Sequence, residues 1–143
     1  MQSHDEARAV IQTLRDYYAA SNKQDVQQMV SYYHEPVMFI TPRGVLTRAT
    51  HAEAIPVVTA FIERLQSMGA ARTEWAESHV KQLSDNLTVA GVVVVRYKAD
   101  GQEVERVGWT YLLQKTSGGW KIVVLAAHPA DTVLRLEHVT MSR

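Results

Sequence analysis

The sequence predicts an α+β fold in a single domain over residues 1–143, with helices first and a long antiparallel sheet after them. Apolar residues recur at helical spacing in three segments before Gly69, and alternating extended segments follow it. The short turn sequences SDN, ADG and SGG separate those extended segments. Segments joined by tight turns pair with their neighbours, so the second half of the chain is expected to form a meander.

The composition is that of an ordinary globular domain. Lys and Arg number 15, and Asp and Glu also number 15, so the formal net charge is zero. Nucleic acids and anionic membranes bind clustered basic residues, so neither partner is expected. The absence of cysteine excludes disulfides, thiolate metal ligands and a cysteine nucleophile. The chain has no secretory start and no apolar run near the ~20 residues that cross a bilayer, so a cytoplasmic protein is expected.

The first two helices carry recognisable start signals. The first helix is expected over about residues 3–20, with Ser3 and Glu6 as a capping box. Asp25 can cap a short second helix. Pro36 is expected to end that helix, because the residue before a proline avoids the helical conformation.

Two short strands and a third helix complete the first half. The strands VMFIT and VLTRA flank the turn TPRG. Thr50 and Glu53 form another capping box, and Pro56 inside the third helix predicts a kink or a late start. The extended segments of the second half are expected over residues 71–82, 86–98, 102–115 and 120–128.

Both faces of the predicted meander are apolar. In its second strand Val93 and Val95 alternate with Val92 and Val94. Antiparallel sheets usually show one face to water, so a doubly apolar sheet needs two covers. The three helices can cover one face, and a partner subunit is the simplest cover for the other, so a homodimer through the sheet face is expected.

The order of elements and two stretches of sequence resemble the nuclear transport factor 2-like superfamily, which includes SnoaL-like polyketide cyclases and ketosteroid isomerases. The stretch YYAASNKQDVQQMVSYYHEPVMF resembles the two-helix opening of that family, and TYLLQKTSGGWKIVVLAAH resembles its final hairpin. The resemblance implies a cone-shaped α+β barrel, in which three N-terminal helices pack in a strongly curved, mainly antiparallel sheet. It also implies a deep apolar pocket at one end and dimers through the sheet.

The resemblance places Tyr17 on the oxyanion-hole tyrosine of ketosteroid isomerase. It places Thr41 on the general-base aspartate of that enzyme and Thr110 near its acid donor. Threonine cannot act as a base near neutral pH, so the steroid isomerase reaction is not expected. A tyrosine hydroxyl in an apolar cavity still donates a hydrogen bond to a ligand carbonyl or phenolate. The alternative for Tyr17 is a core aromatic with its hydroxyl at the rim.

The phase of the strand over residues 102–115 decides which side chains face the pocket. One face carries Arg106, Thr110, Leu112 and Gln114, and the other carries Val107, Trp109, Tyr111 and Leu113. The resemblance favours the Thr110 face in the pocket, which leaves the Trp109 face for the dimer contact. The alternative puts the aromatic residues in the core and Arg106 and Gln114 in water. The ligand-binding candidates are therefore Tyr33, Thr41, Arg106, Thr110, Leu112 and Gln114.

His128 ends the last strand before Pro129, and it joins Tyr17 as a catalytic candidate because a neutral imidazole can act as acid or base. A structural histidine is the alternative. The histidines show no HxH, HxxxH or HExxH spacing, so no metal site is expected. No glycine-rich phosphate loop is present, so no cofactor is expected.

These observations favour a SnoaL-like protein that binds a small apolar or carbonyl-bearing ligand in the pocket, with cofactor-free acid-base catalysis of the isomerase, cyclase or dehydratase type. The alternative is a noncatalytic ligand-binding or dimerisation module, because threonines stand where carboxylates are needed. The sequence does not decide whether the protein is an enzyme.

Overall fold

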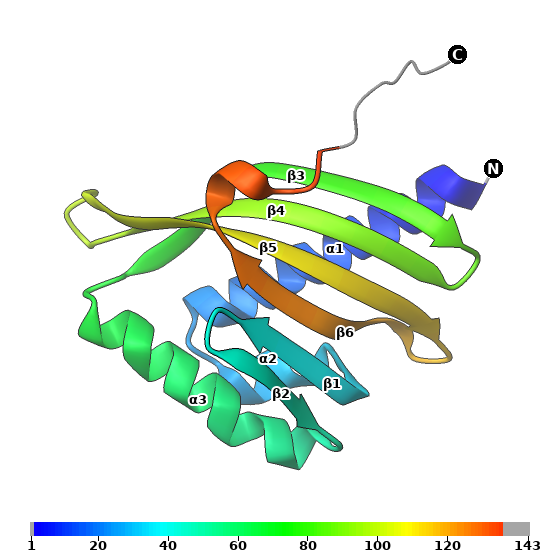
Figure 1. Cartoon of the computed structure of the whole chain (residues 1–143), viewed down its shortest axis with the longest axis horizontal. Helices are drawn as coiled ribbons and strands as arrows, with labels where there is room; N and C mark the ends of the chain where they lie inside the picture. The colour runs from blue at the N-terminus through cyan, green and yellow to red at the C-terminus, as the bar shows by residue number, and fades with distance from the viewer. Residues whose placement is uncertain (1, 136–143) are drawn as a thin grey trace.

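The computed structural model describes residues 2–135, which form two helices, a β-hairpin, a third helix and a four-stranded meander (Figure 1). The predicted α+β fold is confirmed. The elements are α1 (Gln2–Asn22), α2 (Val26–Ser31), β1 (Tyr33–Thr41), β2 (Gly44–Arg48), α3 (His51–Ser67), β3 (Arg72–Ser84), β4 (Leu87–Tyr97), β5 (Glu103–Thr116), β6 (Gly119–His128) and the 3-10 turn η1 (Ala130–Thr132).

The six strands form one mixed sheet in the order β2-β1-β6-β5-β4-β3. The strands β3 to β6 form the expected antiparallel meander, and the β1–β2 hairpin joins it through a parallel pairing of β1 with β6. Helix α1 runs behind the meander, and α3 lies beside β1 and β2 (Figure 1). A cavity lies between α3, the β1–β2 hairpin and the inner face of the meander.

The capping residues of α2 and α3 behave as the sequence predicts. The Asp25 side chain accepts a hydrogen bond from the Gln28 N–H at 3.1 Å. The Thr50 side chain accepts one from the Glu53 N–H at 3.2 Å. Each cap satisfies a backbone donor that the first helical turn leaves without an intrahelical acceptor.

Helix α1 is described from Gln2. The side chain of Ser3, which the sequence predicts as the cap, lies outside the part of the structure that is described. The Glu6 carboxylate accepts a hydrogen bond from Trp120 Nε1 at 2.8 Å and pairs with Lys115 Nζ at 2.5 Å. Glu6 therefore ties the helix to the β5–β6 hairpin.

Pro36 does not end a helix, which differs from the prediction. Helix α2 ends at Ser31, and Pro36 lies inside β1 instead of ending a helix. Tyr33 already pairs with β6, so sheet pairing ends the helix before the proline. Pro36 lies between Tyr33 and Met38, where the β1–β6 pairing is irregular, so its missing N–H is tolerated. Helix α3 begins at His51 and continues through Pro56, so it has no late start.

The strand phase of β5 is opposite to the one the resemblance favoured. Tyr111 and Leu113 are buried in the core, and Trp109 packs against it. Side chains alternate along a strand, so Thr110 and Leu112 lie on the outer face of the sheet. The prediction that the Thr110 face points into the pocket is wrong. Burying the face that carries the larger aromatic and aliphatic side chains removes more apolar area from water.

A bulge reverses the phase of β6. Trp120 and Ile122 point into the core, but beyond the bulge Leu125 is the core residue and Ala127 faces the same way. The pairing with β5 jumps from Ile122 to Val124, so Val123 is the extra residue. His128 is thereby turned to the outer face.

The C-terminal segment, residues 129–135, covers part of that outer face. A Cβ atom on Gly91 of β4 would lie 3.0 Å from the Leu134 carbonyl oxygen and 3.1 Å from Val133 Cγ2. Further along, Arg135 Nε donates to Glu77 of β3 at 2.8 Å. The segment therefore crosses from the end of β6 over β4 to β3. This cover was not predicted from the sequence.

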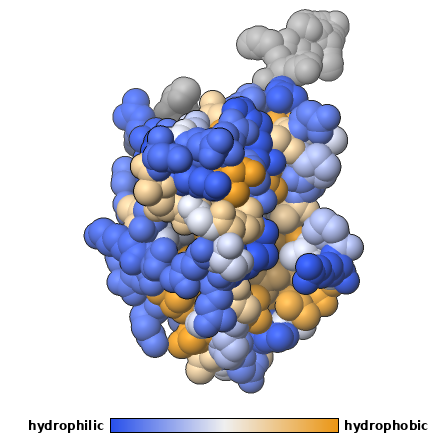
Figure 2. Space-filling view, turned by 90° about the vertical axis from the view of Figure 1, so that its left-hand side faces the viewer, coloured by the Kyte–Doolittle hydropathy of each residue, from blue (hydrophilic) through white to orange (hydrophobic). Residues whose placement is uncertain are grey.

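The surface on the side of the β4–β5 turn is mainly hydrophilic, with separate hydrophobic patches (Figure 2). Strand β2 exposes two large hydrophobic side chains, Val45 and Leu46. No helix within these residues is long and apolar enough to span a membrane.

Candidate functional site

A cavity of about 590 Å³ lies between α1, α3, the β1–β2 hairpin and the inner face of β4, β5 and β6. This volume is within the range of small-molecule sites. The residues of the β1–β2 turn, Thr41 to Gly44, are exposed and line the cavity, which places its mouth at this turn. Most of the wall is apolar. The side chains that bring polar groups are Tyr17, Tyr18, Ser21, Tyr33, Thr41, Arg43, Arg64, Arg96, Trp109 and Tyr111.

Four buried tyrosines form two hydrogen-bonded pairs in the cavity wall. The hydroxyls of Tyr17 and Tyr33 are 2.8 Å apart, and those of Tyr18 and Tyr111 are 2.5 Å apart. Each pair has two hydroxyl hydrogens and uses one of them internally. One hydroxyl hydrogen per pair is therefore left to donate to a cavity ligand.

Burial keeps these tyrosines protonated. Burial raises the pKa of Tyr17 to about 12, against the opposing effects of its hydrogen bond to Tyr33 and of the Arg96 charge. Burial also raises the pKa values of Tyr18, Tyr33 and Tyr111 above their ordinary value. At neutral pH the hydroxyls act as hydrogen-bond donors, and none of them is a general base.

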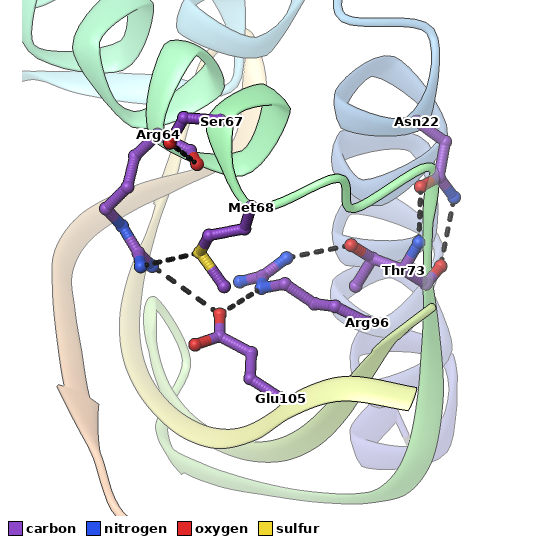
Figure 3. Close-up of polar contacts among 7 residues, drawn as sticks. All are labelled: Asn22, Arg64, Ser67, Met68, Thr73, Arg96 and Glu105. Atoms are coloured by element: carbon purple, nitrogen blue, oxygen red, sulfur yellow. Dashed lines mark hydrogen bonds and ion pairs between the residues drawn. The ribbon is translucent and has the colours of Figure 1, made fainter. Parts of the chain in front are cut away.

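Arg96 brings a buried positive charge to the cavity wall (Figure 3). Its side chain is 2% exposed. Its Nε donates to Glu105 Oε2 at 2.8 Å, and its Nη1 donates to Thr73 Oγ1 at 2.8 Å. The guanidinium carbon lies 5.3 Å from the centroid of the Phe61 ring, which fixes the guanidinium against an aromatic face.

The neighbours of Arg96 are themselves held in place (Figure 3). Asn22 at the end of α1 donates to the Thr73 carbonyl at 3.0 Å and accepts from the Thr73 N–H at 2.8 Å. Arg64 Nη2 lies 3.5 Å from the same Glu105 oxygen that binds Arg96, and Arg64 Nη1 contacts Met68 Sδ at 3.0 Å. The network joins α1, α3, β3, β4 and β5 at one end of the cavity.

One part of the Arg96 guanidinium is unused. Its Nη2 has no hydrogen-bond partner within residues 2–135, and Arg96 lines the cavity. A guanidinium has five N–H donors, and both donors of Nη2 remain available here.

Within the described residues, the cavity wall offers donors and no proton acceptor suited to acid-base chemistry. No aspartate, glutamate or histidine of the described chain lines the cavity. Glu105 contacts Arg96 and Arg64 of the wall, and its Oε2 already accepts from both guanidinium groups. Within residues 2–135 no group of three or more His, Asp or Glu side chains could hold a metal ion.

The structure brings together only some of the predicted site residues. Tyr17, Tyr33 and Thr41 line the cavity. The other candidates lie on the outer face of the sheet, which separates them from Tyr17. They are Arg106, Thr110, Leu112, Gln114 and His128. Arg106 pairs there with Glu103, with 3.1 Å between Nη2 and Oε1.

His128 occupies a packed position on the outer face. Its Nε2 lies 2.8 Å from Thr110 Oγ1, and its Nδ1 lies 2.9 Å from the Pro129 carbonyl oxygen. A Cβ atom on Gly108 would lie 2.7 Å from its ring. The ring fills the space above Gly108 and joins β6 to β5. The catalytic candidate His128 therefore lies on the opposite face of the sheet from Tyr17, because the β6 bulge reverses the side-chain alternation.

Three further residues of the site, Tyr18, Arg96 and Tyr111, were not among the predicted ones. The sequence holds a signal for Arg96, since Ala90, Val92 and Val94 share its face by alternation and all three are buried. A charged residue that continues a buried face is a candidate for a site. For Tyr111 the signal was that it shares a strand face, by alternation, with the apolar residues Val107, Trp109 and Leu113.

Comparison with known proteins agrees with this architecture. A family model described as "NTF2-like protein (DUF6841)" matches residues 5–130. The chain belongs to this NTF2-like family. No curated protein matches the sequence.

Solved structures share the NTF2-like fold at low sequence identity. A Novosphingobium aromaticivorans NTF2-like protein with a cystatin-like fold is 14% identical, with a TM-score of 0.70 over 90% of this chain and 84% of that one. A Shewanella oneidensis NTF2-like protein of unknown function is 16% identical, with a TM-score of 0.65 over 84% and 96%. A Streptomyces avermitilis protein, provisionally named a dehydratase of the NTF2-like family, is 12% identical, with a TM-score of 0.66 over 89% and 97%. At these identities the likeness shows the fold alone.

Proposed function

We propose that this NTF2-like protein binds a small, largely apolar molecule with a hydrogen-bond-accepting oxygen in the cavity, without catalysing its reaction. The observation that carries the proposal is the combination of free tyrosine donors with a wall that lacks a carboxylate or imidazole within the described residues. Apolar walls contribute most of the binding free energy, and a few donors orient the ligand. An oxygen acceptor that meets a buried hydroxyl avoids the cost of leaving that donor unpaired.

The proposal is tested with two probes of nearly equal shape, 2-acetylnaphthalene and 2-ethylnaphthalene, by isothermal titration calorimetry. The ketone is expected to bind roughly two- to tenfold more tightly than the hydrocarbon, which is the value of one net hydrogen bond. Equal affinities would contradict the proposed donor role, and failure of both probes to bind would contradict ligand binding itself.

Variants of the tyrosine pairs locate the donor. A single Tyr17→Phe leaves the Tyr33 hydroxyl hydrogen free, so the pair still offers one donor. The double variant Tyr17→Phe/Tyr33→Phe removes that donor and keeps the ring shapes. The ketone preference is expected to disappear in this variant or in Tyr18→Phe/Tyr111→Phe. Tyr97→Phe at the end of β4, outside the cavity, is the matched control and should leave the preference unchanged.

A second candidate function is cofactor-free acid-base catalysis of the isomerase, cyclase or dehydratase type. It is favoured by the position of Tyr17 in the cavity and by the name of the Streptomyces avermitilis neighbour. It requires a base that the described part of the wall does not supply. Deuterium exchange at the methyl group of bound 2-acetylnaphthalene measures proton abstraction directly, and acceleration by the protein over buffer would favour catalysis over binding alone.

A further inference from the structure

The charged residues of the cavity wall are all of one sign. Arg43, Arg64 and Arg96 line it, and no acidic residue of the described chain does. Glu105 is the one carboxylate that contacts Arg64 and Arg96 in residues 2–135, and it compensates one of these two positive charges. This end of the cavity therefore carries an excess positive charge.

The excess charge is buried and incompletely paired. Arg96 is 2% exposed, and its Nη2 has no partner within the described residues. A buried charge is costly unless it is paired and hydrogen-bonded. The Phe61 ring and the bonds to Glu105 and Thr73 hold the guanidinium in one plane, so Nη2 is preorganised for an acceptor.

The tyrosine pairs lie within the influence of this charge. Tyr17, Tyr18 and Arg96 line the same cavity, and the Arg96 charge opposes the larger effect of burial on the pKa values of Tyr17 and Tyr18. A ligand in this cavity therefore meets a charged donor at Arg96 and neutral donors at the tyrosine pairs. A carboxylate has two oxygens, which suits this donor set.

We propose that the ligand of this cavity is an apolar molecule with an anionic head, a carboxylate in the simplest case, and that Arg96 Nη2 binds the head. This inference rests on the proposed ligand-binding function and specifies the chemical class of the ligand. The apolar wall takes the body of the ligand, and the mouth at the β1–β2 turn carries Arg43, which favours the approach of an anion.

The first test compares 2-naphthoate with its neutral isostere 2-naphthamide on the wild-type protein by isothermal titration calorimetry. The carboxylate is expected to bind at least about tenfold more tightly, as for a charge-assisted hydrogen bond. Equal or weaker binding of 2-naphthoate would overturn the inference. In that case binding of 2-acetylnaphthalene would leave the proposed function intact, whereas failure of every naphthalene to bind would remove both.

Two substitutions separate ligand recognition from a purely structural role of Arg96. Glu105→Gln removes the negative charge but keeps an amide oxygen that accepts the Arg96 Nε–H, so the guanidinium stays in place. The variant is expected to strengthen 2-naphthoate binding several-fold and leave 2-naphthamide binding unchanged. Glu103→Gln, in the exposed pair with Arg106 on the outer face, is the matched control and should change neither affinity. No gain in the Glu105→Gln variant, with its fold verified by circular dichroism, would overturn the inference.

Arg96→Lys provides a readout on Arg96 itself. It keeps the charge but loses the planar fork that bonds Glu105, Thr73 and the ligand together. The preference for 2-naphthoate over 2-naphthamide is expected to fall several-fold while 2-naphthamide binding persists. Binding of 2-naphthamide serves as the internal check that the cavity is intact, and an unchanged preference would overturn the role of Arg96.

Discussion

Gly108 allows the His128 ring to lie on the outer face of β5. A Cβ atom at this position would lie 2.7 Å from His128 Cε1 and 2.8 Å from the Pro129 carbonyl oxygen. These distances are shorter than van der Waals contact, so either the ring or the backbone at the end of β6 has to move. The position of the His128 ring therefore requires a glycine at residue 108.

Gly108→Ala is expected to lower the free energy of unfolding by roughly 1 to 3 kcal/mol, the usual cost of overpacking. Urea denaturation of the variant and the wild type measures the difference. Gly118→Ala is the matched control, because its Cβ atom would meet nothing closer than Thr116 Oγ1 at 3.7 Å. Equal stability of the Gly108→Ala and Gly118→Ala variants would show that the end of β6 yields without cost.

Element α2 has only six residues, so its stability depends on its cap and on packing. Asp25→Ala removes the side-chain acceptor of the Gln28 N–H and is expected to cost about 1 kcal/mol. Gln27→Ala, an exposed position of the same helix, is the control. Hydrogen exchange of the α2 amides reports the loss locally, and unchanged exchange in Asp25→Ala would show that packing of Met29 and Val30 alone maintains the helix.

The sequence predicted elements well where local chemistry decides them. Asp25 and Thr50 cap helices as expected, and the turns of the meander lie where SDN, ADG and SGG predicted them. It failed where long-range pairing decides the outcome. Tyr33 starts a strand because β6 pairs with it, and the bulge at Val123 that turns His128 outward leaves no clear signal in an apolar run.

The same division holds for the candidate site. Tyr17, Tyr33 and Thr41 precede the meander, and all three line the cavity. The error on Thr110 came from assigning a face by resemblance when both faces of β5 are partly apolar. Counting the large side chains on each face would have placed Trp109 and Tyr111 inward.

For the whole molecule, the outer face of the sheet is covered only in part by the chain itself. Leu112 and Val124 are paired neighbours on that face and are half-buried. We propose that a second copy of the chain covers this area, so sedimentation velocity at micromolar concentration should find a dimer. Leu112→Glu is expected to convert the dimer to a monomer. Leu83→Glu, near the end of β3, is the control and should leave the dimer intact. A monomeric wild type would contradict the proposal.

The buried tyrosine pairs are expected to make the whole molecule less stable as the pH rises into the alkaline range. The pKa of Tyr17 is raised to about 12 by burial, whereas an unfolded tyrosine titrates near pH 10. Below about pH 10 both states keep the proton and the full stability is present. Between about pH 10 and pH 12 the unfolded state loses protons first, so each such tyrosine lowers the free energy of unfolding by roughly 1.4 kcal/mol per pH unit.

Urea denaturation across this pH range measures the slope, and phenolate absorbance of the native protein follows the ionisation itself. Tyr18, Tyr33 and Tyr111 also have raised pKa values, so the slope should exceed that of one group. The variant Tyr17→Phe/Tyr33→Phe should show a shallower slope, because two of the titrating groups are gone. A stability that stays constant from pH 10 to pH 12, with phenolate appearing in the native protein near pH 10, would mean that water reaches these hydroxyls and that the cavity is wetter than its lining implies.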